Sequence, residues 1–544
     1  MGFMRCLRSN IHTLKFPSPF PLPTGERGRV RGFERRMKMK RWILILAALF
    51  FSIPSMAFSQ DKTLVVGIMS TVLSLDPANH RDRVTETVIR NMFDGLVTRT
   101  PDGRIVSEIA ESWKNPSPTV WEFKIRKGIT FHNGDPLTAD DVKFTFDRII
   151  TENAIDGKTA MRKGLIDPLQ KVDKIDDYTI RFNLNSPWPI LLAMLPHQQI
   201  IPKKYFESVG TKGFLAKPIG AGPFRFVEGR LDERIVMERY DKYYGGSPEI
   251  KPVGPPPLKR VIFEVIPETA TRIAALQAGK VHIIQNVPSH MVETLKRDSN
   301  VVVKTALGTR VHMFEMNVNQ APFNDVRVRM AMNHAVNMDI IVEKILGGFA
   351  KRMAGAILPH GLYFNEALKP YKHDPALAKK LLAEAGHSKG FPLVIDTIDT
   401  YKEVCEATAQ QFRAVGIEAS VRIWDWGVLR PLALNGERKI VFQSWGNSTL
   451  HPYDLLNPKL MSKDRGNYSQ FSNPELDDLL KKGGVETNPD KAKEIYLRAQ
   501  YLIYNEAPWV FGYVPMEIEA CSKNVENWVP SSDSRINLHR VSLK

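Results

Sequence analysis

The sequence predicts a protein of mixed α/β class, on three observations. Apolar residues alternate with charged ones at Trp121, Phe123 and Ile125, which is the period of a half-buried strand. Other apolar residues recur at helical spacing after recognisable helix starts. In the second half of the chain a strand, a helix and a strand follow in order, which indicates a βαβ unit and a partly parallel sheet.

Strand signals dominate the first half of the chain. Besides the run at 121–125, strands are predicted at 63–69, 178–184 and 281–284. Thr138 is predicted to cap a helix, and Asp141 three residues later completes the pattern of a capping box. Residues 268–278 are predicted to form a helix that Gly279 ends.

The second half is richer in helix. Asp374-Pro375 begins a predicted helix that Gly386 ends. The predicted βαβ unit follows, with a strand at 391–395, a helix at 403–414 and a strand at 419–423. Two further helices are predicted to begin at Asn473-Pro474 and Asn488-Pro489.

The positive charge of the chain is concentrated at its N-terminus. The 544 residues carry a formal charge of +16, which at first suggests a nucleic-acid binder. Residues 1–60 hold a surplus of +9, so the other 484 residues carry only +7. Because those charges are interspersed, we expect a mildly basic surface and no groove for nucleic acid.

The N-terminus carries the pattern of a secretory signal peptide at 37–59. Lys38, Lys40 and Arg41 precede an apolar run at 42–51, and small residues precede two cleavage points, after Ala57 and after Ser59. The alternative, a membrane anchor, needs about 18–20 apolar residues. The run is shorter, so we expect export and cleavage.

Residues 1–36 precede Met37 and fit no targeting pattern. We expect them to be a non-native extension, with synthesis beginning at Met37 or Met39. Only Cys405 and Cys521 follow the leader, and they either pair or remain as two buried thiols.

Motifs typical of enzymes are missing. The sequence contains no His-Glu-x-x-His, no Gly-x-Ser-x-Gly and no Gly-x-x-x-x-Gly-Lys-Ser/Thr. Histidines are scattered, without a pair at metal-ligand spacing on one helix. We therefore expect no enzyme, no cofactor and no resident metal.

A series of segments in fixed order resembles one bacterial family. They are Leu75-Asp76-Pro77-Ala78, 91–97, 109–113, 123–142 (FKIRKGITFHNGDPLTADDV), 220–224 (GAGPF), 272–280, 322–331 (PFNDVRVRMA), 378–386 (AKKLLAEAG), 467–480 and 507–509. Together they are similar to the bacterial extracellular solute-binding proteins of family 5, the dipeptide-, oligopeptide- and nickel-binding components of ABC importers. The resemblance covers essentially all of residues 61–544.

The resemblance implies a two-lobed periplasmic-binding-protein fold, class II-like with an extra subdomain in lobe I, and a ligand cleft between the lobes. Lobe I would comprise 61–305 plus 513–544, and lobe II 309–512. Closure of the lobes would bury the ligand, as in hinge-type domain closure. Asp94, Asp140 and Asp325 lie in matching motifs, and we expect them to be caps or turn residues.

Several residues are candidates for contact with the ligand. Met69 and Ser70 end the first strand, where the family's lobe I lines the cleft. Arg310 follows the implied first crossover, and its guanidinium is suited to a two-point grip on a carboxylate or phosphate. The alternative role for Arg310 is a salt bridge between lobes. Trp424, Trp426 and Trp445 are suited to stacking on a ligand or to packing in the core, and among them Trp445 is the favoured contact.

The segment 444–452 (SWGNSTLHP) bears most directly on ligand class. Peptide-binding members carry an aspartate shortly after the matching tryptophan, where it holds the peptide's ammonium group, and Ser448 occupies that position here. Loss of that charge-assisted bond costs about 1.5–3 kcal/mol, so peptides with a free α-amino group are disfavoured unless Asp425 or Asp454 substitutes. Asn447 and Thr449 flank Ser448 as further candidate contacts. His451 matches a region where nickel-binding members use histidine, but a lone histidine is a poor metal site.

The sequence thus predicts a periplasmic, monomeric receptor that delivers a peptide-like or other small polar solute to the permease of an ABC importer. A sugar-like or opine-like conjugate and a metal chelate remain alternative ligands. A periplasmic enzyme, and a ligand sensor or chaperone without a role in transport, are the alternative functions.

Overall fold

The largest sheet contains twelve strands in the described part of the chain, and one strand, β18, belongs to both of its halves. The structure is a computed structural model that describes residues 62–101 and 103–544. The predicted extension and signal peptide lie outside these residues. The strand order is β16-β15-β17-β13-β18-β11-β1-β10-β9-β8, and β12 and β14 also pair with β18. The strands are β1 (Thr63–Ile68), β8 (Phe224–Arg230), β9 (Arg234–Arg239), β10 (Arg260–Val265), β11 (Ile283–Ile284), β12 (Val301–Leu307), β13 (Arg310–Met316), β14 (Ala350–Arg352), β15 (Pro392–Thr397), β16 (Glu418–Ile423), β17 (Ile440–Gly446) and β18 (Trp509–Ser522).

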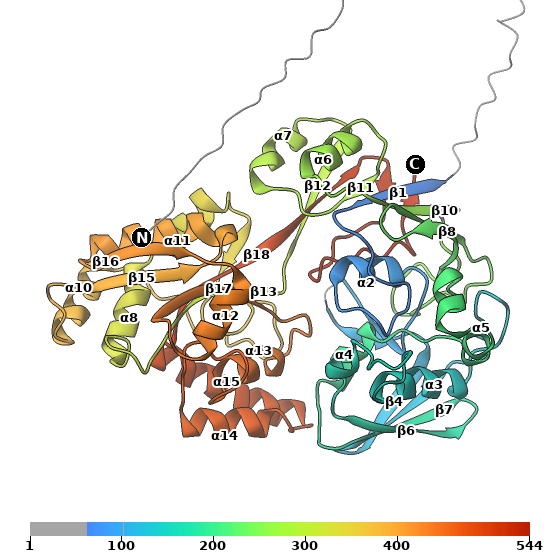
Figure 1. Ribbon diagram of the computed structural model, residues 1–544, viewed down its shortest axis with the longest axis horizontal. Helices are drawn as coiled ribbons and strands as arrows, with labels where there is room; N and C mark the ends of the chain where they lie inside the picture. Colours follow the sequence, from blue (N-terminus) through green and yellow to red (C-terminus); the bar gives the residue numbers. More distant parts are fainter. Residues whose placement is uncertain (1–61, 102) are drawn as a thin grey trace, which may run out of the picture. The chain divides into compact units, whose positions relative to one another are not determined.

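The chain passes between the two halves of this sheet at β18 and at the β12–β13 junction. The first part of β18 pairs with β13 and β14, and its last part pairs with β12 and β11 (Figure 1). Only Gly308 and Thr309 separate β12 from β13. The backbone N–H of Gly308 donates to the carbonyl of Pro515 at 2.9 Å, so the two connections are tied together. We call the β1 half sheet A and the β13 half sheet B.

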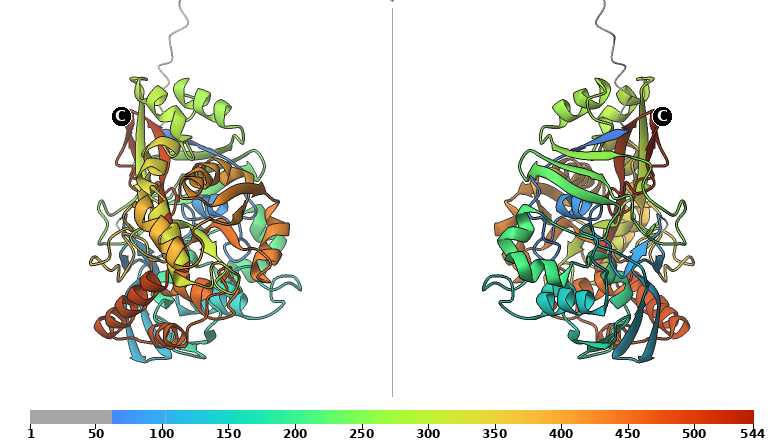
Figure 2. Two further views of the ribbon diagram at one scale, coloured as in Figure 1. Left: turned by 90° about the vertical axis from the view of Figure 1, so that its left-hand side faces the viewer. Right: turned by 90° about the vertical axis from the view of Figure 1, so that its right-hand side faces the viewer.

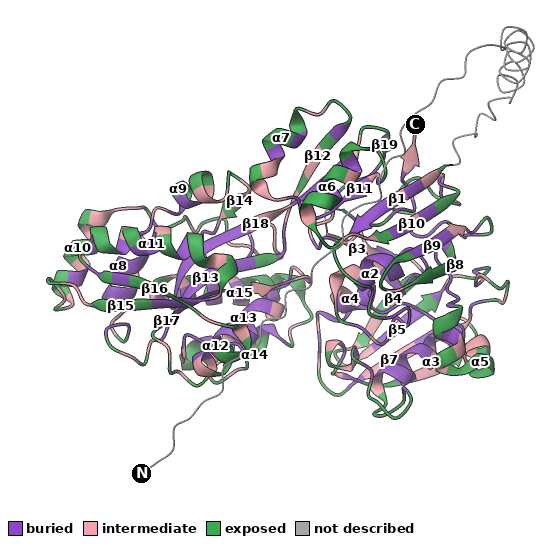
Figure 3. Ribbon diagram, turned by 45° about the horizontal axis from the view of Figure 1, so that its top comes forward, coloured by how far each residue is buried: buried purple, intermediate pink, exposed green. Residues whose placement is uncertain are grey.

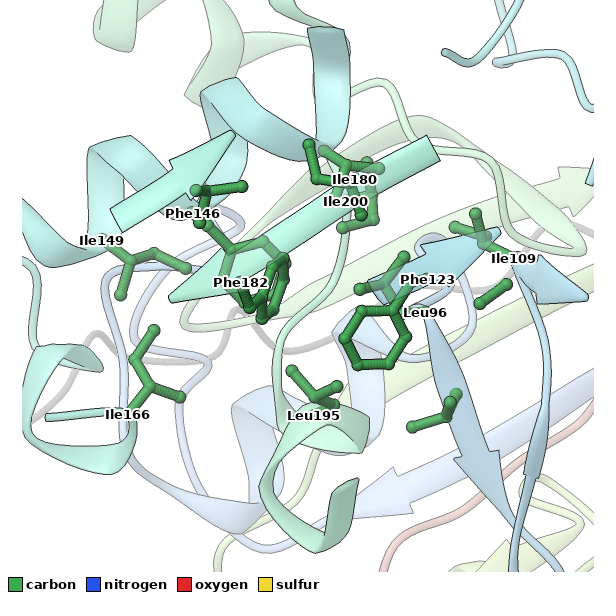
Figure 4. Close-up of a cluster of buried hydrophobic side chains, with 14 of the residues drawn as sticks. Leu96, Ile109, Phe123, Phe146, Ile149, Ile166, Ile180, Phe182, Leu195 and Ile200 are labelled. Carbon is green, nitrogen blue, oxygen red and sulfur yellow. The ribbon is translucent and has the colours of Figure 1, made fainter. Parts of the chain in front are cut away.

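A second, four-stranded sheet, in the order β4-β5-β7-β6, lies apart from sheet A in the same half of the molecule (Figure 1). Its core is aromatic: the ring of Phe182 lies 5.1 Å from that of Phe123 and 4.6 Å from that of Phe146 (Figure 4). The capping box predicted at Thr138 and Asp141 is confirmed, and it begins α3. The elements are β4 (Ala110–Ser117), β5 (Val120–Ile125), β6 (Leu169–Asp176), β7 (Thr179–Leu184) and α3 (Ala139–Ile150).

The predicted βαβ unit forms the outer part of the sheet B half. Strands β15 and β16 are parallel and are joined by α11. The helix starts at Asp374, Asn473 and Asn488 are also confirmed, because each side chain accepts a backbone N–H in the first turn of its helix. Burial follows this layering, with the inner strands β17 and β18 mostly buried (Figure 3). The helices of this half are α8 (Val326–Ala335), α9 (Met338–Ile340), α10 (Pro375–Glu384), α11 (Lys402–Ala414), α12 (Trp426–Leu434), α13 (Tyr453–Leu460), α14 (Pro474–Gly483) and α15 (Pro489–Glu506).

Shorter elements complete the sheet A half. Helices α6 and α7 lie near β11 and β12, as the side views also show (Figure 2). Gly279 ends the α6 region in a left-handed conformation, as predicted. The elements are α2 (Arg83–Ile89), β2 (Val97–Arg99), β3 (Ile105–Ser107), α4 (Leu191–Met194), α5 (Lys203–Ala216), α6 (Thr269–Gln277), α7 (Val292–Lys296), β19 (Val525–Glu526) and β20 (Ser542–Leu543). In the described residues no helix has the length and apolar character needed to cross a membrane.

Three predicted roles are decided by the structure. Cys405 and Cys521 are separate buried thiols. Asp325 caps α8, as predicted. The prediction for Asp94 is wrong: it is buried and accepts hydrogen bonds from the hydroxyls of Tyr243 and Tyr244, at 2.8 and 2.6 Å. The local sequence suggested a turn, but the tyrosines come from a segment about 150 residues away.

Candidate ligand-binding site

Arg310 is the first residue of β13 and lies directly after the junction between the two sheets. In the register of β13 and β17 it is opposite Gly446. Its guanidinium donates to the hydroxyl of Ser444 at 3.1 Å, and this hydroxyl is 2.9 Å from that of Tyr401. Arg310 is therefore held by sheet B while it stays exposed to solvent.

A second arginine reaches the same junction from α2. The guanidinium of Arg83 lies 3.2 Å from the carboxylate of Glu517 and 3.5 Å from the hydroxyl of Thr309. Partial burial and the charge of Arg83 lower the pKa of Arg310, and Glu517 opposes them. Glu517 pairs with Arg83 and acts on Arg310 only electrostatically, so two guanidinium groups lie near a single carboxylate. This arrangement favours an anionic partner.

Three aromatic rings pack against one another near Arg310. The imidazole of His312 stacks on Tyr513 with ring centroids 4.8 Å apart, and Tyr401 meets it edge-on at 5.3 Å. Burial lowers the pKa of His312 to about 3, so the ring is neutral at physiological pH. These rings therefore add no charge beside Arg310.

The segment after β17 forms hydrogen bonds to both the interlobe junction and the sheet A half of the molecule. The backbone N–H of Asn447 donates to the carbonyl of Thr309 at 2.7 Å. Arg99, at the end of β2, donates to the carbonyl of Thr449 at 3.4 Å. Asn447 is fully buried, and its side-chain nitrogen has no acceptor within the described residues.

A cavity of about 350 Å³ lies beside this segment. Thr309, Ser448 and Leu450 line it from the sheet B side, and Arg99, Arg535 and Arg540 are among the residues from the sheet A side. Of the predicted site residues, Ser448 is the one that lines this cavity. The position expected to hold an aspartate is thus occupied by a serine that faces several cations.

Neither alternative carboxylate lines this cavity. Asp425 caps α12 through the backbone N–H of Gly427. Asp454 accepts a hydrogen bond from the hydroxyl of Thr449 at 3.3 Å, and burial raises its pKa.

The other predicted contacts lie in different surroundings. Trp445 donates to the carbonyl of Asp454 at 3.1 Å, and Trp424 donates to the carboxylate of Asp396 at 2.6 Å, so both rings are held by their own lobe. Met69 is exposed at the end of β1, with its sulfur 2.9 Å from the amide nitrogen of Asn286, and Ser70 follows it, also exposed.

His451 is a core residue. Its ring lies edge-on to Tyr363 and Tyr496, and burial lowers its pKa to about 4. In the described part of the chain no cluster of three or more histidine, cysteine or acidic residues could hold a metal ion.

Several residues of the junction were not predicted from the sequence. Arg83 and Glu517 are 434 positions apart, and the cavity combines residues from six separate segments. Arg83, Arg99 and Tyr401 lie in no motif that marks them, so no local signal could have identified them.

Two sheets that share one long strand, with a site where the chain passes between them, define a two-lobed α/β ligand-binding protein. The family model of the bacterial extracellular solute-binding proteins, family 5 (middle region) matches residues 104–467. The chain belongs to this family, and it is the substrate-binding component of an ABC importer.

Its relatives are named for different ligands. Heme-binding protein A of Haemophilus influenzae is 29% identical over 457 residues, which cover 78% of this chain and 81% of that protein. The glutathione-binding protein GsiB of Pectobacterium atrosepticum is 25% identical over 521 residues, 93% of this chain and 98% of that protein.

Solved structures are similar over nearly the whole described chain. HbpA2 of Haemophilus parasuis superposes with a TM-score of 0.82 at 23% identity, covering 89% of this chain and 100% of that chain. The periplasmic binding protein DppA of Helicobacter pylori, in complex with the peptide STSA, superposes with a TM-score of 0.70 at 27% identity, covering 88% and 98%. The predicted fold class is confirmed.

Proposed function

We propose that the protein captures a small, peptide-like solute that carries at least one anionic group, in the periplasm, and presents it to the importer's permease without altering it. The observation that carries this proposal is the pair Arg83 and Arg310 beside a single carboxylate at the junction of the two sheets. The relatives named for glutathione and heme are consistent with it, because both compounds carry carboxylates.

The two connections between the sheets support closure of the lobes around the ligand. We take residues 61–305 plus 513–544 as lobe I and 309–512 as lobe II, which places Gly308 at one connection and β18 at the other. A two-strand connection of this kind permits a hinge motion about a few residues. Met69, Ser70, Arg310 and the 445–449 segment are the proposed ligand contacts, brought together by closure.

Mass spectrometry of the solute that co-purifies with the native protein tests the ligand class. A neutral or purely cationic solute would contradict the proposal. Chemical change of the solute during incubation would favour a periplasmic enzyme. Uptake of the solute that is unaffected by deletion of the gene would favour a sensor or chaperone.

Replacing Arg310 with alanine is expected to weaken binding of the co-purified solute about 10- to 100-fold, because a charge-assisted hydrogen bond is lost. The measurement is isothermal titration calorimetry, with Arg225→Gln as control. Arg225 forms a surface ion pair with Glu238 on β8 and β9, away from the junction. Equal affinities of Arg310→Ala and the wild-type protein would assign Arg310 a structural role.

Replacing Ser448 with aspartate is expected to raise the affinity for an unmodified dipeptide about tenfold or more, since the ammonium group then gains a charged acceptor. The wild-type protein is expected to bind the same dipeptide weakly. A large thermal shift of the wild-type protein with that dipeptide would contradict this prediction. Ser448→Asn, which has similar size and no charge, is the matched control.

A further inference from the structure

The cavity beside Ser448 has an unusual surplus of positive charge. It lies between the β2–β3 hairpin, residues 250–252 and the C-terminal segment 527–540, and it reaches Thr309 and Ser448 on the other side. Its ionisable lining residues are Arg90, Arg99, Lys251, Arg535, Arg540 and Asp533. Five cations therefore face one carboxylate.

Carboxylates next to the arginines that line this cavity compensate only part of the charge. Glu86 is shared by Arg90, Arg162 and Arg535, at 3.1, 3.3 and 2.8 Å. Asp533 pairs with Arg535 at 2.8 Å. Asp533 also lies 3.9 Å from Arg90. One carboxylate thus serves three guanidinium groups, and the second serves two of the same three.

Two further buried carboxyl groups, those of Glu108 and Asp94, lie near the cavity residue Arg540. Burial raises the pKa of Glu108 well above its ordinary value and that of Asp94 to about 6. Both groups lie near Arg540 and act on its charge. Five cations and one carboxylate line the cavity itself, so the positive surplus there does not depend on these two groups.

Two guanidinium nitrogens at this cavity have no acceptor. The Nε atoms of Arg99 and Arg535 are buried and make no hydrogen bond to any described residue. The side chain of Arg535 is only 9% exposed. A buried charged donor without an acceptor is costly, and together with the surplus charge this points to an acceptor that enters from outside the chain.

We propose that the cavity binds an oxyanion, a carboxylate or phosphate group, through Arg535, Arg540 and Arg99, with Lys251 at its rim. Guanidinium groups suit planar, two-point recognition of such oxygens. The cavity volume of about 350 Å³ is at the lower end of small-molecule sites. The oxyanion is either a free ion or one end of the transported solute. The free-ion case is independent of the proposed function, and the second case rests on it.

Titration of the purified protein with inorganic phosphate at low ionic strength tests the site. We expect one phosphate bound per chain, with Arg540→Gln weakening binding about 10- to 100-fold. Lys251→Gln at the exposed rim should weaken it less than about fivefold. Arg225→Gln, which removes a surface arginine elsewhere in lobe I, should have no effect. Absence of phosphate binding, or equal affinities of Arg540→Gln and Arg225→Gln, would overturn the proposal.

A carboxylate introduced into the cavity provides a second test that does not depend on removing an arginine. Ser532 lines the cavity, and Ser532→Glu is expected to raise the melting temperature in the absence of anions and to abolish the response to phosphate. Ser532→Gln is the matched control without charge. A lower melting temperature for the glutamate variant than for the glutamine variant would contradict a need for negative charge here.

Competition distinguishes the two sources of the oxyanion. Glutathione, a peptide with two carboxylates, serves as the solute probe. Phosphate that competes with glutathione would assign the cavity to one end of the solute, and independent binding would assign it to a free ion. If glutathione does not bind while phosphate still requires Arg540, the cavity is an oxyanion site and the proposed peptide-like ligand is excluded for this probe.

Discussion

Replacing Lys459 with methionine is expected to destabilise the protein by about 3–5 kcal/mol, because it leaves a buried carboxylate without its partner. Lys459 and Glu315 are both fully buried, and their charged atoms are 2.5 Å apart. The ammonium group also lies 4.1 Å from the centre of the Tyr468 ring. Urea unfolding monitored by circular dichroism measures the loss.

Two further variants control this measurement. Lys482 pairs with Asp478 on the surface of α14, and Lys482→Met should leave the unfolding midpoint nearly unchanged, since exposed pairs contribute little. The double variant Lys459→Met with Glu315→Met removes both charges and should recover most of the stability. A double variant as unstable as Lys459→Met would show that packing of the lysine, and not the unpaired charge, accounts for the loss.

The loss should also depend on pH. Burial raises the pKa of Glu315, while Lys459 lowers it, so removal of the lysine raises this pKa further. When the pKa of a carboxyl group is higher in the folded state than in the unfolded state, the free energy of unfolding falls as the pH rises above the unfolded-state pKa. Lys459→Met should therefore be closest to the wild-type protein near pH 5 and furthest from it near pH 8.

Replacing Gly222 with alanine is the second large expected effect, with a loss of about 3 kcal/mol or more from overpacking. A Cβ atom at this position would lie 2.5 Å from the backbone carbon of Met92 and 2.7 Å from the backbone nitrogen of Phe93. Because the obstacle is backbone, no side-chain rotation relieves it. The N–H of Gly222 also donates to the carbonyl of Met92 at 2.9 Å.

Gly164→Ala is the matched control for this prediction. A Cβ atom there would meet Arg81 at 3.8 Å, which is ordinary contact. We expect its melting temperature to stay within a few degrees of the wild-type value, while that of Gly222→Ala falls clearly. Comparable melting temperatures for the two variants would show that the segment at Met92 can move away.

Elements that depend on neighbouring residues were predictable. The capping box at Thr138, the helix starts at Asn473 and Asn488 and the parallel pair β15–β16 follow from short-range patterns. The motif Gly220-Ala221-Gly222-Pro223-Phe224 is likewise recognisable from its place in the chain, although its close approach to Met92 appears only in the folded structure.

Features that depend on distant segments were not predictable. The sequence suggested a turn role for Asp94, whereas the structure buries it against Tyr243 and Tyr244. A hydrogen bond between residues far apart leaves no periodic trace in either local sequence. For the same reason, the sequence could not show that Trp424 and Ser448, which are only 24 positions apart, lie in different surroundings.

By itself the sequence determined the α/β class, the family resemblance and the departure at Ser448, because each is written in residues that are close together or in fixed order. The tertiary structure alone decided that Arg83 joins Arg310 at the junction and that cations from residues 90, 99, 251, 535 and 540 meet in one cavity. Charges assembled from several remote segments concentrate only when folding brings those segments together, and the mildly basic, interspersed charge of the chain gives no sign of them.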